Sequence, residues 1–225
     1  MKSICILALS SIPAIVCAQQ APSQEDVFQL CLQLAQRQQR LIESVHDEAS
    51  GDLAAAELKA LGAAIIGLYS SEPMSKLSTE QQQQLLSCVN AVVLKAQELK
   101  KLGFYGSRLM LAAYDSMKLT ELPEPTEEQI NKGTAYVREQ YELVENQLQG
   151  ITDRQSADEA ALRLISIQHL AELAWSAGVL RYEFLQEMQA GRASSADNAT
   201  HMKRIRQADF YGSRLLKEIF RQAAE

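Results

Sequence analysis

The residue types that the sequence has few of already exclude several classes of protein. Among its four cysteines no two are spaced as CxxC, which excludes a zinc ribbon and a CxxCH haem site, and four are too few for a dense disulfide scaffold. Basic residues are also scarce, with 22 Lys and Arg against 28 Asp and Glu, which argues against a general nucleic-acid-binding protein. The hydrophobic fraction of 47% is nevertheless that of an ordinary globular chain.

Long hydrophobic runs are missing except for a short one at the N-terminus. A positively charged start, Met1-Lys2, precedes an apolar run from Ser3 to Val16 and small residues as far as Ala18. This is the order found in secretory signal peptides, and the run is shorter than the ~20 apolar residues of a membrane-spanning helix. We therefore expect residues 1–18 to be a signal peptide cleaved near Ala18. The mature protein would be exported, periplasmic or secreted, with no transmembrane segment.

Proline is absent from most of the mature chain, which favours helices. Its four prolines lie between periodic segments, and none occurs after residue 125. The segments that start at Ser78 and Thr126 begin with capping-box patterns, and both are rich in Ala, Leu, Gln, Glu, Lys and Arg. We expect an all-α protein with helices at about 24–48, 51–70, 78–117, 127–152, 156–189 and 196–223.

Apolar periodicity agrees with an all-α helical bundle. Spacings of four and three residues place one stripe on a single helix, formed by Ile130, Thr134, Val137, Tyr141, Val144, Leu148 and Ile151. Such a stripe is typical of helices packed nearly antiparallel. No segment shows the sustained alternation of a strand, so no sheet is expected.

The chain contains an internal duplication with an offset of 106 residues. The hexamer FYGSRL occurs twice, as Phe104, Tyr105, Gly106, Ser107, Arg108 and Leu109 and as Phe210, Tyr211, Gly212, Ser213, Arg214 and Leu215. A second block matches at the same offset, with Asp47, Ser50 and Asp52 repeated as Asp153, Ser156 and Asp158. We expect two tandem three-helix modules, residues 19–118 and 126–225, joined by a linker at 119–125.

The repeated acidic block has a mechanical interpretation. The first Asp of each copy would end one helix, the Ser would cap the next, and the second Asp would place negative charge on its first turn. Paired acids could instead bind a metal, but capping explains the spacing without one. We therefore expect no metal site.

The repeated hexamer has two interpretations. In the first, which we favour, Phe104 and Leu109 fill the core while Gly106 and Ser107 let another helix approach closely. In the second, Tyr105 and Arg108, with their second copies, form a recognition patch of the composition found in interface hot spots. The two hexamers would then meet or flank a groove.

The repeated (F/Y)YGS-x-L ending and the D-x-x-S-A-x-x-A-A helix start, which runs from Asp153 to Ala161, resemble exported bacterial all-helical proteins of unknown function. The resemblance covers about 20 residues of each module. It implies an all-α exported protein and brings no activity and no site residues with it.

Two cysteines, Cys31 and Cys88, remain after removal of the signal peptide. In an up-down-up module the first and third helices are parallel, and both thiols would lie at a similar distance from one end. An exported protein permits oxidation, so we expect a Cys31–Cys88 disulfide, with two free thiols as the alternative.

No motif for catalysis or for a cofactor is present. Glu43 and His46 match one half of a di-iron motif, but no second half occurs. We expect an exported structural or protein- or ligand-binding module, with a protein or envelope component as partner, no nucleic acid and an undetermined oligomeric state. The alternative is a small-molecule carrier or enzyme that uses a pocket between the modules, which would be lined by His169, Trp175 and Tyr182.

Overall fold

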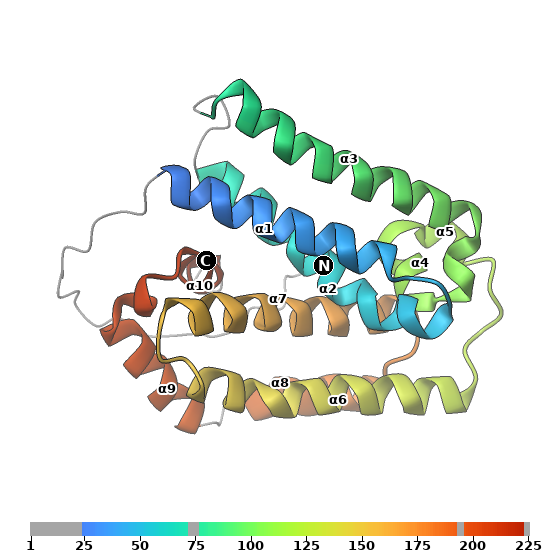
Figure 1. Cartoon of the computed structure of the whole chain (residues 1–225). Coiled ribbons are helices and arrows are strands. Elements are labelled where there is room, and N and C mark those ends of the chain that lie inside the picture. Colours follow the sequence, from blue (N-terminus) through green and yellow to red (C-terminus); the bar gives the residue numbers. More distant parts are fainter. Residues whose placement is uncertain (1–23, 72–76, 193–195, 223–225) are drawn as a thin grey trace.

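The computed structural model describes residues 24–71, 77–192 and 196–222, which are helical with no strand (Figure 1). The prediction of an all-α helical bundle is confirmed. The expected signal peptide, residues 1–18, lies outside the described residues. In the described part of the chain, no helix combines the length and the hydropathy needed to cross a bilayer.

Ten α-helices and two short 3-10 segments follow one another along the described chain. They are α1 (Gln24–Glu43), α2 (Glu48–Ser71), α3 (Thr79–Lys101), η2 (Gly103–Gly106), α4 (Arg108–Tyr114), α5 (Ser116–Leu119), α6 (Glu127–Gln149), α7 (Arg154–Ser176), α8 (Tyr182–Arg192), α9 (Ala196–Gln207), η3 (Asp209–Gly212) and α10 (Arg214–Gln222). Ser78 and Thr126 form the capping boxes expected of them, with Gln81 and Gln129.

Three of the expected helices are interrupted. The helix expected at 78–117 breaks at η2, and the one expected at 196–223 breaks at η3, because the backbone is left-handed in both segments. The helix expected at 156–189 ends at Ser176, and Gly178 (φ +73°) then turns the chain into α8. These breaks were not predicted, because helix propensity and apolar periodicity do not indicate where the backbone becomes left-handed.

Helices α2 and α7 form the centre of the molecule, where they run antiparallel and pack against each other (Figure 1). Helix α1 packs on α2 and also on α3, whereas α6 packs on α7 and also on α9. The short helices α4 and α10 each contact both central helices. They lie at opposite ends of the central pair (Figure 1).

The buried apolar side chains form two clusters, and each draws on both halves of the chain. The first contains Leu58 and Phe104 together with Val137 and Leu170. The second contains Cys31 and Leu61 together with Ile151, Leu216 and their neighbours. Both clusters therefore contain residues from each side of the 119–125 segment, and neither cluster belongs to one half of the chain alone.

A glycine inside α6 allows the α7–α8 loop to pass close to that helix. A Cβ atom built on Gly133 would lie 2.3 Å from the carbonyl oxygen of Val179. Gly costs about 1 kcal/mol relative to Ala in a helix interior. At Gly133 this lower helix propensity is offset by a close backbone contact that a larger residue would prevent.

Replacing Gly133 by Ala is expected to lower the free energy of unfolding by about 1–3 kcal/mol, because the new methyl group overlaps a backbone carbonyl that cannot rotate away. Gly67→Ala is the matched control, since nothing lies within 4 Å of its Cβ position in α2. It should stabilise by up to about 1 kcal/mol. Urea unfolding followed by Trp175 fluorescence measures both, and equal effects would contradict the close approach.

Candidate functional site

The repeated acidic block caps α2 and α7 in the same way. The Oδ1 atoms of Asp47 and Asp153 accept the backbone N–H groups of Ser50 and Ser156, both at 2.8 Å. Each Ser Oγ accepts the backbone N–H of its Asp in return, at 3.1 and 3.0 Å. The expected roles are therefore exchanged: Asp153 is the N-cap residue and Ser156 occupies the third helical position. Hydrogen bonds from Ser50 and Ser156 hold the pKa of Asp47 and Asp153 below the usual value for a carboxyl.

The second acid of each block connects to the repeated hexamer. Ser107 Oγ donates to Asp52 Oδ1 at 2.7 Å, and Ser213 Oγ donates to Asp158 Oδ1 at 2.6 Å. Both serines are fully buried. Burial raises the pKa of Asp158, and the Ser213 hydrogen bond opposes that shift. The expectation that Asp52 and Asp158 charge a first turn is wrong, because each lies just beyond the first turn of its helix; each instead anchors the start of the short helix that follows a left-handed turn.

Left-handed backbone precedes each of these serines. Four consecutive residues have positive φ, from 49° to 84° at Gly103–Gly106 and from 48° to 75° at Asp209–Gly212. A left-handed turn costs about 1–2 kcal/mol for each non-glycine residue, so the surrounding contacts must hold it in place. Gly106 has open space around its Cβ position, so the expected close helix approach does not occur there. It occurs at Gly51, whose Cβ would lie 2.9 Å from Ser107 Cβ.

Most of the first hexamer is built into the fold. Phe104, Ser107, Arg108 and Leu109 are buried, and the Arg108 guanidinium donates to the Pro123 carbonyl oxygen. In this copy only Tyr105 and Gly106 are exposed. These contacts agree with packing as the role of the hexamer.

The second hexamer repeats the ring packing of the first. The Phe104 and Tyr114 rings stack at 5.9 Å between centroids, and those of Phe210 and Phe220 stack at 5.8 Å. The Tyr211 hydroxyl accepts a hydrogen bond from Arg204 at 2.9 Å. Because the two hexamers lead into α4 and α10, at opposite ends of the central pair, they do not meet (Figure 1).

The expected disulfide is wrong, because Cys31 and Cys88 are both free thiols. Cys31 is fully buried in the second core cluster, whereas Cys88 is half-buried at the edge of that cluster. A shared height along parallel helices does not make two side chains face each other, and both residues can pack in one cluster without bonding. Burial raises the pKa of Cys31 to about 11, with Arg214 opposing the shift.

The side chains expected to line a pocket between the modules line neither of the two cavities described below. His169 Nδ1 lies 3.1 Å from Glu172 Oε2 on the same helix. Trp175 and Tyr182 form an exposed ring pair, with 6.2 Å between centroids.

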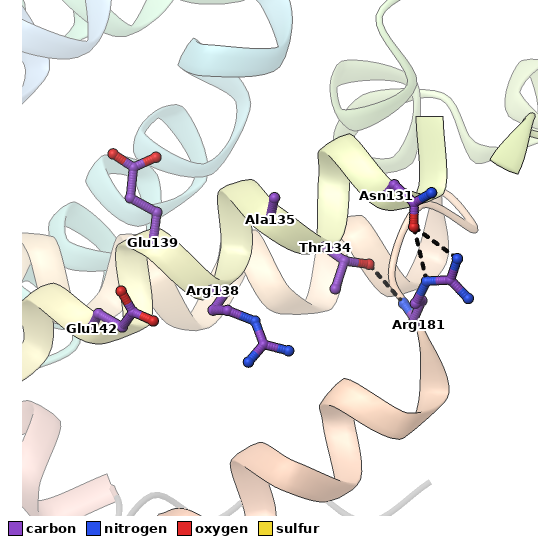
Figure 2. A pocket seen from close by; sticks show the side chains of 7 residues that line it. All are labelled: Asn131, Thr134, Ala135, Arg138, Glu139, Glu142 and Arg181. Atoms are coloured by element: carbon purple, nitrogen blue, oxygen red, sulfur yellow. Dashed lines mark hydrogen bonds between the residues drawn. The ribbon is translucent and has the colours of Figure 1, made fainter. Parts of the chain in front are cut away.

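A depression of about 380 Å³ lies beside α6 and the start of α8 (Figure 2). Its Arg181 donates from its backbone N–H to Thr134 and from its guanidinium to Asn131 (Figure 2). The same guanidinium also donates to Glu127. Its Arg138 pairs with Glu187 and lies over the Phe184 ring. Both cations of this depression are thus already used within the protein.

A second cavity of about 220 Å³ opens where α1, α2, α6 and α7 come together. We call it the interhelical groove, and it is lined by Arg37, Leu53, Ala56, Glu57, Ala60, Leu61, Tyr136, Gln140, Leu143, Gln147, Leu162, Arg163, Ser166, Ile167 and Leu170. Its buried lining is apolar and includes Ala60, Leu61 and Ile167. Many of its lining residues correspond at the repeat offset, as Glu57 does to Arg163 and Ala60 to Ser166.

The charges of the interhelical groove are unequally used. Arg37 Nε donates to Glu57 Oε1 at 2.7 Å, so this pair is neutralised. The exposed Arg163 makes no hydrogen bond or ion pair with any described residue. Burial raises the pKa of Tyr136, and the carboxylates of Glu139, Asp52 and Glu57 raise it further. Tyr136 therefore remains a neutral hydroxyl beside a group of acids.

Alkylation tests the state of the two cysteines. In the native protein, iodoacetamide at mildly alkaline pH should modify Cys88 alone, because the Cys31 thiol is buried and its raised pKa keeps it protonated. Both thiols should react in urea without reductant. Intact-mass spectrometry counts the modified sites. If neither thiol were modified in urea, Cys31 and Cys88 would be joined in a disulfide and the free thiols would be contradicted.

Ser107→Ala and Ser213→Ala test the two anchors. Each should lower the free energy of unfolding by about 1–3 kcal/mol, because each leaves a carboxylate and a helix-start N–H without their buried partner. Ser176→Ala is the control, since Ser176 is exposed and bonds only the Glu172 carbonyl oxygen. Urea titration compares the three, and losses no larger than that of the control would show that the anchors are not required.

No protein family model, no curated protein and no solved structure matches this chain. The functional interpretation therefore rests on the chain's own residues and geometry. Among the cavities described, the interhelical groove is the one that combines contributions from four helices, two exposed leucines and a cation without an internal partner. It is the candidate site.

Proposed function

We propose that this chain is an exported helical binding protein, built from two related three-helix modules, that holds a small ligand in the interhelical groove. Export follows from the signal-peptide pattern of residues 1–18 and from the resemblance to exported helical proteins. The expected structural role for the chain becomes secondary, because a groove lined by four helices favours the carrier alternative.

Matching interactions support the relationship between the modules. The Asp52–Ser107 and Asp158–Ser213 hydrogen bonds, the two Asp–Ser caps and the two ring stacks all recur with an offset of 106 residues. Each module would then consist of two long helices and a third segment divided by a left-handed turn.

One observation carries the binding role: the interhelical groove leaves large apolar side chains exposed at its rim. Leu53 of α2 is 63% exposed and Leu143 of α6 is 36% exposed, and both line the groove. A bound apolar group would cover these side chains and remove their surface from water. The volume of about 220 Å³ lies below that of pockets for drug-sized molecules, so the ligand is expected to be small.

Benzyl alcohol is a suitable neutral probe, measured by saturation-transfer NMR. It should bind with a dissociation constant on the order of millimolar, and Ser166→Leu should weaken binding at least about tenfold by filling the groove from α7. Gln155→Leu is the matched control, because it makes a similar change on an exposed part of the same helix outside the groove. Circular dichroism establishes that both variants fold.

Undiminished binding by folded Ser166→Leu would place the probe elsewhere and contradict the proposed site. Absence of binding by the unaltered protein would contradict a small-ligand role for the groove.

A further inference from the structure

A single guanidinium group, that of Arg204, caps the C-terminal end of α6 and the loop after it. Its Nη1 atom donates to the Ile151 carbonyl oxygen at 2.6 Å and to the Tyr211 hydroxyl at 2.9 Å. Its Nη2 atom donates to the carbonyl oxygens of Leu148 and Gln149, at 2.8 and 3.2 Å. The last carbonyl groups of a helix have no partner within the helix and carry partial negative charge, so a cation is favourable there.

The repeat provides the same acceptors at the C-terminal end of α1. At the offset of 106 residues, the counterparts of the four acceptors are the carbonyl groups of Ile42, Glu43 and Val45 and the hydroxyl of Tyr105. Ile42 and Val45 pack in the first core cluster with Leu99 and Phe104. The counterparts of these four residues also pack together, in the second cluster, and are Leu148, Ile151, Ile205 and Phe210. The first copy therefore has the local fold of the Arg204 site.

The cation of that site has no counterpart in the first copy. Glu98 stands at the position of Arg204, and a carboxylate has no proton to donate to a carbonyl group. The Glu98 side chain is 63% exposed and pairs with Lys95 at 3.2 Å. The His46 imidazole, in the loop after α1, contacts the Ser44 carbonyl oxygen at 2.7 Å. Neither Glu98 nor His46 thus replaces the Arg204 guanidinium.

The acceptors of the first copy are consequently little used. Among the described residues, no N–H or O–H group donates to the carbonyl oxygens of Glu43 and Val45, and the Tyr105 hydroxyl has no hydrogen bond. The Ile42 carbonyl oxygen accepts the Val45 N–H at 3.3 Å and keeps its second lone pair. A guanidinium from another molecule would find the four acceptors that the chain itself supplies to Arg204.

Two exposed apolar side chains accompany these acceptors. Tyr105 is 39% exposed, and Leu102, whose carbonyl oxygen accepts the Tyr105 N–H, is 57% exposed. In the second copy, Ala208 replaces the leucine, and the Arg204 guanidinium lies over the half-buried Tyr211 ring at 5.9 Å. A small guanidine compound would cover the Tyr105 ring but leave Leu102 in water, whereas an arginine within a protein segment brings neighbouring residues that cover both.

We propose that the C-terminal end of α1, together with Tyr105 and Leu102, is a docking site for an arginine side chain of a partner protein. The guanidinium takes, in the first copy, the place that Arg204 takes in the second. It suits the site better than an ammonium group, because its two terminal nitrogens donate in a fixed planar geometry. Tyr and Arg are also the residue types that dominate binding energy at protein interfaces. None of these residues lines the interhelical groove, so the docking site is independent of ligand binding there.

Three peptides that differ in one residue test the proposal: acetyl-Leu-Arg-Leu-amide and its analogues with lysine or neutral citrulline in the centre. In NMR titrations at low ionic strength, the arginine peptide should bind with a dissociation constant on the order of millimolar, and both analogues at least about threefold more weakly. Ethylguanidinium should also bind more weakly than the arginine peptide, because it cannot cover Leu102.

Glu98→Arg should abolish binding of the arginine peptide, because the new internal guanidinium would occupy the site itself. It should also raise the midpoint of urea unfolding. Glu145→Arg is the matched control, since it makes the same change of charge on an exposed residue near the C-terminal end of α6. The contribution of the helix dipole is then similar in both variants, and the control should keep peptide binding.

Tyr105→Phe and Tyr211→Phe compare the two copies directly. Tyr105→Phe removes an acceptor of the docking site but no internal hydrogen bond, so it should weaken binding of the arginine peptide about threefold and leave the urea midpoint unchanged. Tyr211→Phe removes the acceptor of Arg204, so it should lower the midpoint and leave peptide binding unchanged.

The proposal is overturned if no peptide binds, if the three peptides bind equally, or if Glu98→Arg binds the arginine peptide as tightly as Glu145→Arg does. Binding of ethylguanidinium as tight as that of the arginine peptide would exclude a protein segment as the occupant. Because benzyl alcohol tests the interhelical groove separately, failure of either site leaves the other result intact.

Discussion

The fold depends on the partly buried hydrogen bond between Asp52 and Ser107 and on its counterpart between Asp158 and Ser213. Each bond joins a residue near the start of a central helix to the start of the short helix that comes after a left-handed turn. A run of four residues with positive φ is unfavourable by itself, so the chain reverses there only if the contacts beyond the turn are good. The serine supplies two of them at once, because it donates to the acid and accepts an N–H group of the new helix. This reversal places α4 and α10 across both central helices.

The sequence predicted the elements that local rules determine. Helix content, the capping boxes at Ser78 and Thr126, and the burial of Phe104 and Leu109 follow from propensity, spacing and periodicity. The breaks at η2 and η3 could not be predicted in this way. Phe, Tyr and Asp seldom adopt positive φ, and no local sequence pattern indicates that they do so here. The cysteine prediction was wrong for a related reason: it used height along the helices, whereas a disulfide requires that two side chains face each other.

The candidate site was harder to predict than the fold. Its residues are ordinary members of four amphipathic helices, and no spacing distinguishes Arg163 from other surface cations. Packing of α2 against α7 makes the groove, and that contact joins residues about a hundred positions apart. His169, Trp175 and Tyr182 drew attention because they are rare residue types, yet rarity does not determine where a side chain points. The correspondence of Glu57 with Arg163 at the repeat offset was a usable signal, because residues that correspond in two packed copies of a helix can face a shared axis.

The shared core has a consequence for symmetry. Residues 24–122 alone would expose the face of α2 that now packs on α7, and α4 would lose one of the two central helices that it contacts. That face would be covered again only if the half-chain paired with another molecule, for example with an identical copy in the isologous manner of a twofold dimer. In the full chain α7 belongs to the same molecule as α2. Contact between the two helices therefore does not depend on protein concentration. The residues that correspond at the repeat offset can also differ within one chain, and the interhelical groove accordingly has Glu57 on α2 and Arg163 on α7.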